Sequence, residues 1–212
     1  AGIIKNEVPV VIGEILPETL PVFEKVSAQK KSTLFLAERE WAIISSNWEN
    51  HKLLITVKYD KEETFKLDLA GIYQRKNLVT VLESCRVLTN KGWKIDPIHI
   101  KNAVSRVKRL TGLHGRWEII RHSPLLVLDV AHNANGIEQL VEQIRGTKHS
   151  QLHIVLGMVK DKDADQVLSL LPKNATYYFT KAQIPRALAE EELQKKASRY
   201  GLNGNSYTSV NT

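Results

Sequence analysis

The chain has 212 residues, of which 42% are hydrophobic and 25% charged, a balance typical of a globular protein with little room for disorder. Its formal net charge of +7 is compatible with nucleic acid, a membrane surface or small anionic ligands, because the same field attracts all three. The single cysteine excludes an internal disulfide, and no apolar run approaches the roughly 20 residues of a membrane helix, so a cytoplasmic protein is expected.

The first half of the chain has the pattern of a βαβ unit followed by a small antiparallel sheet. The βαβ unit consists of a strand, a helix and a second strand, expected at residues 8–12, 17–30 and 33–37. Short stretches that alternate apolar and polar residues, separated by polar turns, predict antiparallel strands around residues 43–44, 53–59 and 64–69.

Two helices with clear end signals close this half. Apolar residues recur with the helical period over 78–88 and a stop follows at 90–92, so Cys85 is predicted to be a small core residue rather than a nucleophile. The second helix opens at Asp96 as its N-cap, followed by a proline in the first helical position, and ends near Gly112. Gly112 is therefore the expected domain boundary.

The second half alternates strands and helices at a spacing that favours a parallel sheet covered by helices. Its strand cores, LLVLDV and LHIVLGM, are nearly continuous apolar runs, as strands buried on both faces should be. Strands are expected at residues 125–130, 152–156 and 176–179, and helices at residues 136–144, 164–171 and 189–200.

Polar residues cluster in the loop after the first of these strands. Ligands of open parallel sheets bind beside the carboxyl ends of strands, near helix N-termini, and Asp129, His132 and Asn133 occupy such a loop. From the residues alone the structural explanation is favoured, with Asp129 accepting backbone N–H bonds and His132 satisfied by a carbonyl group. Asn135 and Glu138 have the spacing of a capping box, which explains Asn135 without any function.

Three further polar positions each have a functional and a structural interpretation. Arg116 is suited to a bidentate grip on a phosphate, or is a surface arginine beside Glu118. The Asn77 amide is suited to the donor and acceptor edge of adenine, or is an N-cap. Asp163, with Gln166, is able to cap the following helix.

Six segments together resemble the folylpolyglutamate synthase and dihydrofolate synthase branch of the Mur ligase superfamily. In chain order they are AGIIKNEVPVVIGE, LAGIYQRKNLVTVLESCRVL, HGRWEII, LVLDVAHNANG, GMVKDKD and QIPRALAEEEL. They are similar to the family segment after its modified lysine and to its L-x-G-x-x-Q-x-x-N, PGRxE, DGAHNP, G-x-x-x-DKD and RAL-x-x-x-x-L motifs. Six short motifs in register are much harder to obtain by chance than one. The chain departs from the family at His114, Val130 and Ala134, which replace proline, glycine and proline.

The resemblance implies an α/β protein in two parts. Residues 1–112 would be the remainder of a Mur-ligase-type central ATPase domain, and residues 113–212 a truncated, Rossmann-like C-terminal ligase domain with a mostly parallel sheet. The implied activity is ATP-dependent amide formation, in which a carboxylate of folate or dihydropteroate becomes an acyl phosphate that L-glutamate attacks. ATP and Mg²⁺ are the implied cofactors. The resemblance further implies a cytoplasmic monomer without nucleic-acid or membrane partners.

By the same resemblance, Asn77 is expected to contact adenine and Arg116 a phosphate of ATP. Asp129 is assigned to nucleotide or interdomain contact, and His132 to the placement of glutamate near the reacting centre. Asp129 and His132 are also the catalytic candidates. They would form half of an interdomain active site.

The remaining assignments are coarser. Asn133 and Arg186 are expected to contact substrate, whereas the roles of Asp161, Lys162 and Asp163 stay open. No G-x-x-x-x-G-K-[ST] phosphate loop occurs in the sequence, nor do the Mg²⁺ ligands that belong with it. This chain is therefore expected to hold no metal site and to be inactive alone.

Two alternatives stay open. A Mur-type ligase acting on a peptidoglycan precursor would share the fold and differ in substrate. A non-catalytic anion- or nucleic-acid-binding module would explain the +7 charge and predicts affinity for DNA or RNA that falls steeply with salt. Against that module, lysines and arginines are scattered, and no aromatic residues alternate with them as a base-stacking platform requires.

Overall fold

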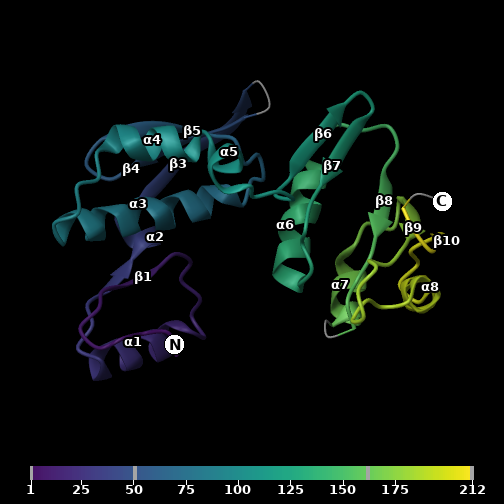
Figure 1. Ribbon diagram of the computed structural model, residues 1–212, viewed down its shortest axis with the longest axis horizontal. Helices are drawn as coiled ribbons and strands as arrows, with labels where there is room; N and C mark the ends of the chain where they lie inside the picture. The colour runs from purple at the N-terminus through teal and green to yellow at the C-terminus, as the bar shows by residue number, and fades with distance from the viewer. Residues whose placement is uncertain (1, 50–51, 161–162, 211–212) are drawn as a thin grey trace. The chain divides into compact units, whose positions relative to one another are not determined.

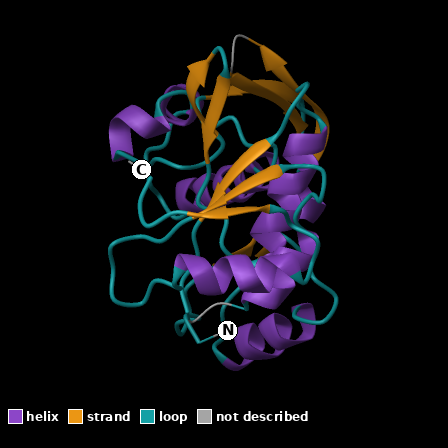
Figure 2. Cartoon of the chain, turned by 90° about the vertical axis from the view of Figure 1, so that its right-hand side faces the viewer, coloured by secondary structure: helices purple, strands orange, loops and turns teal. Residues whose placement is uncertain are grey.

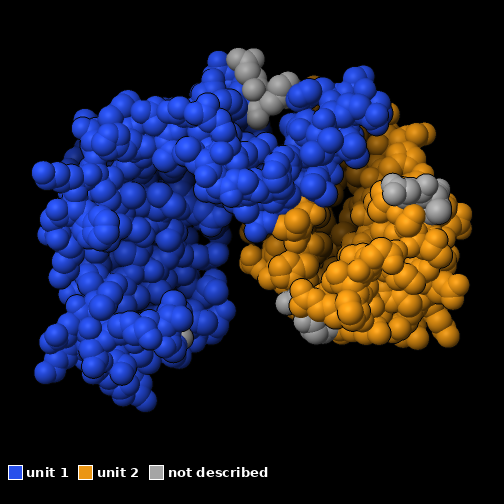
Figure 3. All heavy atoms as spheres, viewed as in Figure 1, with its two compact units in different colours: residues 1–128 blue, residues 129–212 orange. Residues whose placement is uncertain are grey.

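The computed structural model describes residues 2–49, 52–160 and 163–210 and has an α/β fold (Figure 1). The chain forms two compact units, residues 1–128 and residues 129–212 (Figure 3). The elements of the first unit are β1 (Val10–Ile12), α1 (Leu20–Gln29), β2 (Leu34–Leu36), α2 (Ala37–Glu40), β3 (Ala42–Glu49), β4 (Lys52–Lys58), β5 (Glu62–Leu67), α3 (Gln74–Asn90), α4 (Pro97–Val104), α5 (Val107–Thr111), β6 (Glu118–His122) and β7 (Leu125–Leu128). Those of the second are α6 (Ala134–Arg145), β8 (His153–Leu156), α7 (Ala164–Leu170), β9 (Thr176–Phe179), α8 (Glu190–Ser198) and β10 (Gly204–Ser206). Figure 2 distinguishes the helices and strands of the chain by colour.

The first unit begins with the predicted βαβ arrangement. β1 and β2 are parallel, with Val10 opposite Leu34, and α1 connects them. The helix begins at Leu20 rather than at Pro17. Pro21 has no N–H to donate, so it fits only in the first turn of a helix, and that turn starts at Leu20.

The predicted antiparallel sheet follows, in the order β3–β4–β5. Alternation along β4 buries three side chains completely, those of Leu53, Ile55 and Val57. They belong to a core with residues from α2, β5 and α3: Ala37, Phe65, Leu67, Leu78, Val79 and Leu82. Burial of a side chain of this size stabilises by about 1.5–3 kcal/mol, so β4 and α3 anchor the unit. Cys85 is half-buried on α3, and burial raises the pKa of its thiol, which suits a packing role.

A buried ion pair lies beside this core. The fully buried Glu83 carboxylate accepts hydrogen bonds from Arg86 Nε at 2.8 Å, Arg86 Nη2 at 2.6 Å and Trp41 Nε1 at 3.1 Å. The Arg86 guanidinium lies 5.6 Å from the ring centroid of Phe35 and 5.2 Å from that of Tyr59. Burial alone would raise the pKa of Glu83, but the hydrogen bonds from Arg86 and Trp41 outweigh it, so that pKa is lowered. The pair therefore ties α3 to β2 and to the segment before β3.

The helix predicted between Asp96 and Gly112 is two helices. Asp96 is the N-cap of α4, as expected, and its side chain accepts the N–H two residues later at 2.8 Å. After α4 ends, the Asp68 carboxylate accepts hydrogen bonds from Val107 N at 3.0 Å and Lys108 N at 2.9 Å. This distant cap starts α5, which ends at Gly112 with a φ of 67°.

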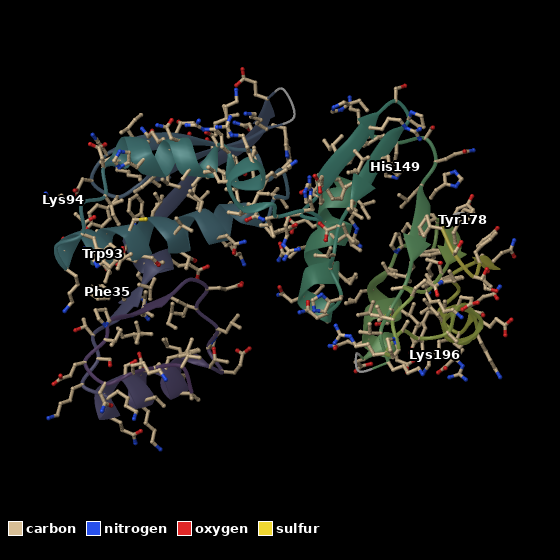
Figure 4. All side chains as sticks on the ribbon, in the orientation of Figure 1. Phe35, Trp93, Lys94, His149, Tyr178 and Lys196 are labelled. Carbon is tan, nitrogen blue, oxygen red and sulfur yellow. The ribbon has the colours of Figure 1, made fainter. Side chains whose placement is uncertain are left out.

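The second unit contains the predicted parallel sheet, in the order β10–β9–β8. Its core joins one face of β9 to all three helices: Ile137, Val141, Val167, Leu168, Tyr177, Phe179, Leu193 and Ala197. Tyr178 projects from β9 (Figure 4) and lies 5.9 Å, ring to ring, from both His153 and Tyr207. β10 was not predicted, because Gly-Asn-Ser has no strand-forming preference and only its pairing with β9 makes it a strand.

One predicted strand pairs differently from the expectation. The segment expected at residues 125–130 is β7, which pairs antiparallel with β6 rather than joining the parallel sheet. Only Ser123 and Pro124 separate the two strands, and a two-residue connection favours an antiparallel hairpin. Leu125, Leu126 and Leu128 are consequently exposed, whereas the apolar run had indicated burial on both faces.

The hairpin of β6 and β7 belongs to the first compact unit, although the sequence places it after Gly112. The division into domains at residues 1–112 and 113–212 stays a prediction. Among the helices of the described residues, none combines the length and the apolar composition needed to cross a membrane.

Candidate functional site

Two predicted catalytic residues lie in residues 129–133, the loop between β7 and α6. Asp129 Oδ1 accepts a hydrogen bond from Ala131 N at 2.9 Å. His132 is exposed, and its Nδ1 lies 3.0 Å from Val130 O. A carbonyl oxygen only accepts, so Nδ1 carries a proton, and in the tautomer that this hydrogen bond selects Nε2 is the acceptor. Both residues therefore have the backbone hydrogen bonds that the structural interpretation predicted, and the one at His132 selects the tautomer with the proton on Nδ1.

Asn133 is the N-cap of α6. Its backbone is extended, with φ −131° and ψ 165°, and its Oδ1 accepts the Gly136 N–H at 2.8 Å. The sequence assigned a capping box to Asn135, which lies instead in the first turn of the helix. The Asn133 side-chain oxygen is thus committed to the helix, and its NH₂ group is the part that suits a ligand.

The loops after β8 and β9 pair through their main chains. Residues 158–160 run antiparallel to residues 186–188, with Lys160 N donating to Arg186 O at 2.9 Å. The pairing places the predicted substrate residue Arg186 directly beside the GMVKDKD segment. The Arg186 side chain is exposed.

The KDKD run is described only in part. Asp161 and Lys162 lie outside the described residues. Asp163 is the N-cap of α7, and its Oδ1 accepts a hydrogen bond from Gln166 N at 3.0 Å, which confirms the capping interpretation.

Three polar residues after β9 were missed by sequence reasoning. Thr180 is buried, and its hydroxyl has no hydrogen-bond partner within the part of the chain that the structure describes. Lys181 Nζ lies 3.0 Å from Oε2 of Glu190, the first residue of α8. A hydrogen bond from its own backbone N–H, then one from Lys181, lower the pKa of Glu190. Their position in the sequence could have indicated them. Thr180 directly follows β9, as Gly157 directly follows β8, and ligands of parallel sheets bind at these carboxyl ends of the strands.

Arg116 lies in the turn between α5 and β6. Its Nη1 donates to Gly115 O at 3.2 Å. Glu118, which the sequence set beside Arg116, instead accepts hydrogen bonds from His114 Nδ1 and Gly115 N, both at 2.9 Å. These two hydrogen bonds, that from Gly115 foremost, lower the pKa of Glu118 against the opposing effect of burial.

Asn77 is exposed on α3, and its Nδ2 donates to Gln74 Oε1 at 2.9 Å. Tyr73 is the N-cap of this helix, so the structural alternative for Asn77, an N-cap, is wrong. The Asn77 side-chain carbonyl keeps its capacity to accept a hydrogen bond from a ligand.

The predicted residues thus fall into separate groups. Asn77 and Arg116 belong to the first compact unit, on different elements. In the second unit, Asp129, His132 and Asn133 share one loop, and Arg186 lies in another. Within residues 2–49, 52–160 and 163–210, no cluster of three or more His, Cys, Asp and Glu side chains is arranged to hold a metal ion.

Comparison with known proteins gives consistent matches. Residues 115–212 match the family described as Mur ligase, glutamate ligase domain. The folylpolyglutamate synthase of Lacticaseibacillus casei is 25% identical over 199 residues, which are 90% of this chain and 45% of that protein. The chain therefore spans about half the length of the curated relatives it matches.

Solved structures also match nearly the whole of this chain and about half of their own. Escherichia coli FolC in complex with DHPP and ADP has a TM-score of 0.77 at 26% identity, over 99% of this chain and 47% of that one. The Mycobacterium tuberculosis folylpolyglutamate synthase complexed with ADP has a TM-score of 0.82 at 24% identity, over 93% of this chain and 44% of that one, which supports the fold alone.

Proposed function

We propose that this chain, which belongs to the folylpolyglutamate and dihydrofolate synthase branch of the Mur ligase family, works within a longer ATP-dependent ligase. That ligase adds L-glutamate to dihydropteroate, to the glutamyl tail of folates, or to both. The likeness to FolC, which extends over nearly the whole chain, carries this proposal. The Asp129, His132 and Asn133 side chains of the LVLDVAHN segment support it.

The reaction proceeds through an acyl phosphate. A carboxylate oxygen of the folate attacks the γ-phosphorus of ATP, and ADP leaves. The amino group of glutamate then attacks the acyl carbon, the amide bond forms, and inorganic phosphate leaves. Such phosphoryl transfer depends on positioning and charge neutralisation more than on covalent help from the protein.

His132 acts on glutamate. Because Nδ1 donates to Val130 O, Nε2 of the neutral ring accepts a hydrogen bond or a proton from the glutamate ammonium, and a free amine is what attacks the acyl phosphate. Asp129 shapes the same loop through Ala131 N. Asn133 and Arg186 contribute donors to the carboxylates of the substrate.

Nucleotide contacts belong to the first unit in this proposal. The Asn77 amide meets adenine, and the Arg116 guanidinium meets a phosphate, where a planar fork of donors fits better than a lysine. Mg²⁺ accompanies ATP, and no residue of this chain is assigned to it. The net charge of +7 suits ligands that are all anions. A cytoplasmic monomer completes the proposal, together with inactivity of the 212-residue chain alone.

A matched pair of histidines tests the role of His132. His149 (Figure 4) is also exposed, and its Nδ1 contacts the carbonyl oxygen two residues earlier, that of Thr147, as His132 contacts Val130. In the full-length ligase, His132→Ala should lower turnover by a factor on the order of 10²–10⁴, and His149→Ala should leave it unchanged. Turnover is measured as phosphate released from ATP with folate and glutamate present. Equal turnover in both variants would return His132 to a purely structural role.

Substrate dependence tests the reaction itself. Phosphate release from ATP should require both a pterin substrate and glutamate. Release that needs a peptidoglycan precursor instead would favour the other Mur-type ligase. Tight binding of DNA or RNA that weakens steeply with salt, without phosphate release, would favour the binding module.

A further inference from the structure

The Arg116 turn is held by one buried carboxylate. Glu118 begins β6, is 8% exposed, and receives donors from the residues just before Arg116. His114 Nδ1 lies 2.9 Å from Oε1 and 3.1 Å from Oε2, and Gly115 N donates to Oε2 at 2.9 Å. Lys108 Nζ, on α5, lies 4.0 Å from Oε1. These contacts form a clasp, defined here as Glu118 with His114, Gly115 and Lys108.

The backbone inside the clasp is unusual on both sides of Arg116. Gly115 has a φ of 72° and Trp117 a φ of 48°. A left-handed conformation is rare for a bulky residue such as tryptophan, and it persists only where surrounding contacts impose it. Trp117 is 7% exposed, so its side chain is packed inside the protein, and the Glu118 carboxylate binds the residues just before Arg116. The conformations of Gly115 and Trp117 therefore set the direction in which the Arg116 side chain leaves the backbone.

The Arg116 guanidinium is linked to the same clasp. Its Nη1 donates to Gly115 O, and the N–H of that glycine is bound by Glu118. His114 stands where the family resemblance would place a proline, so a side-chain hydrogen bond here restrains a turn that proline would restrain by its ring.

We propose that Glu118 is a positioning residue for Arg116, with His114 as the side chain that locks the turn. The proposal rests on the proposed function, in which Arg116 contacts a phosphate of ATP. Glu118 touches no substrate; it sets the backbone from which the guanidinium reaches its ligand. A charged acceptor suits the task, because its two oxygens serve His114 and Gly115 together.

Glu118→Gln removes the charge and one acceptor oxygen at almost constant volume. Glu62→Gln is the control, since Glu62 also begins a strand, β5, but is exposed. The first measurement needs no activity: trypsin cleavage after Arg116 is followed in the 212-residue chain by mass spectrometry. Cleavage at that bond should be at least severalfold faster in Glu118→Gln and unchanged in Glu62→Gln. Equal cleavage rates in Glu118→Gln and wild type would overturn the clasp.

The second measurement concerns the nucleotide. In the full-length ligase, Glu118→Gln should lower kcat/KM for ATP about 10- to 100-fold, as a misdirected contact does, with Glu62→Gln unaffected. Adding Glu118→Gln to Arg116→Ala should cause no further loss, because the positioned group is already gone. Additive losses would overturn the positioning role.

Failure of the proposed function has a different signature. If Arg116→Ala leaves kcat/KM for ATP unchanged, Arg116 contacts no phosphate, and the positioning role is overturned with it; the cleavage rates would still report whether the clasp orders the turn. If Glu118→Gln does not fold, His114→Ala replaces it, since the His114 side chain is 68% exposed and its removal spares the core. His114→Ala should then also speed trypsin cleavage after Arg116 and lower kcat/KM for ATP.

Discussion

Removal of Arg86 should reveal how much the buried Glu83 carboxylate depends on it. In Arg86→Met the Glu83 side chain, which has no exposed surface, keeps only the hydrogen bond from Trp41. Breaking a buried pair by removing one partner costs about 3–5 kcal/mol. Because the Arg86 side chain is 26% exposed, we expect the lower end, about 3 kcal/mol, of which stacking on Phe35 and Tyr59 contributes about 0.5–1 kcal/mol.

The double variant Glu83→Leu/Arg86→Met provides the comparison. It leaves no buried charge, and its main cost is the lost acceptor of Trp41 Nε1, about 1–2 kcal/mol. It should therefore be more stable than Arg86→Met alone, although it carries one more substitution.

The assay is urea unfolding followed by tryptophan fluorescence. All four tryptophans lie in the first compact unit, so this signal reports that unit alone: Trp41, Trp48, Trp93 and Trp117. A loss below about 1 kcal/mol in Arg86→Met, or a double variant no more stable than the single one, would refute the reasoning.

The pH dependence of the same experiment has a definite sign. In the wild type the pKa of Glu83 is lowered, so its contribution to stability is present above the ordinary value of 4.5 and is lost as the pH falls through the lowered one. In Arg86→Met burial acts with little opposition and raises that pKa above its unfolded value. The deficit of Arg86→Met should therefore shrink as the pH falls from neutral toward 5. A deficit that grows over this range would contradict the assignment.

Two further predictions concern the second unit, whose thermal unfolding is followed by the circular dichroism of the tyrosines, because four of the six tyrosines lie in that unit. Asn133→Ala should cost about 1 kcal/mol because Gly136 N loses its acceptor, whereas Asn133→Asp keeps the cap and should change little; equal losses would refute the capping role. Gly204→Ala would place a methyl group 1.9 Å from Tyr177 O and should strongly lower the midpoint temperature of unfolding. Gly146→Ala is the control, because its methyl group would lie 3.7 Å from the nearest atom, and it should leave that temperature unchanged. An unchanged midpoint temperature in Gly204→Ala would mean that β10 does not pair with β9 as described.

Local signals in the sequence predicted most of the elements. Asp96 followed by proline indicated the start of α4, and the apolar period of 78–88 indicated α3, because each signal lies within the element that it specifies. What escaped prediction depends on distant partners. The break before α5 is imposed by Asp68, about 40 residues away, and β10 is a strand only because β9 lies beside it.

The candidate site shows the same division. The LVLDVAHN string indicated Asp129 and His132 as candidates and a carbonyl partner for the histidine, but not that Nδ1 and the Val130 oxygen are the two atoms that pair. Nor did the sequence indicate the partners of Glu118: it placed this glutamate beside Arg116, whereas the carboxylate accepts hydrogen bonds from His114 and Gly115. The backbone conformation determines which neighbour a side chain can bind. The left-handed φ of Trp117 cannot be predicted from composition or periodicity.

The main-chain pairing of residues 158–160 with residues 186–188 has a consequence for sequence divergence. Its hydrogen bonds come from N–H and C=O groups that every non-proline residue has, so substitution at Lys160 or Arg186 leaves the frame of the two loops standing. Both side chains are exposed on that frame. A lineage could therefore exchange the chemistry presented by this pair of loops in single steps, each of which keeps the protein folded.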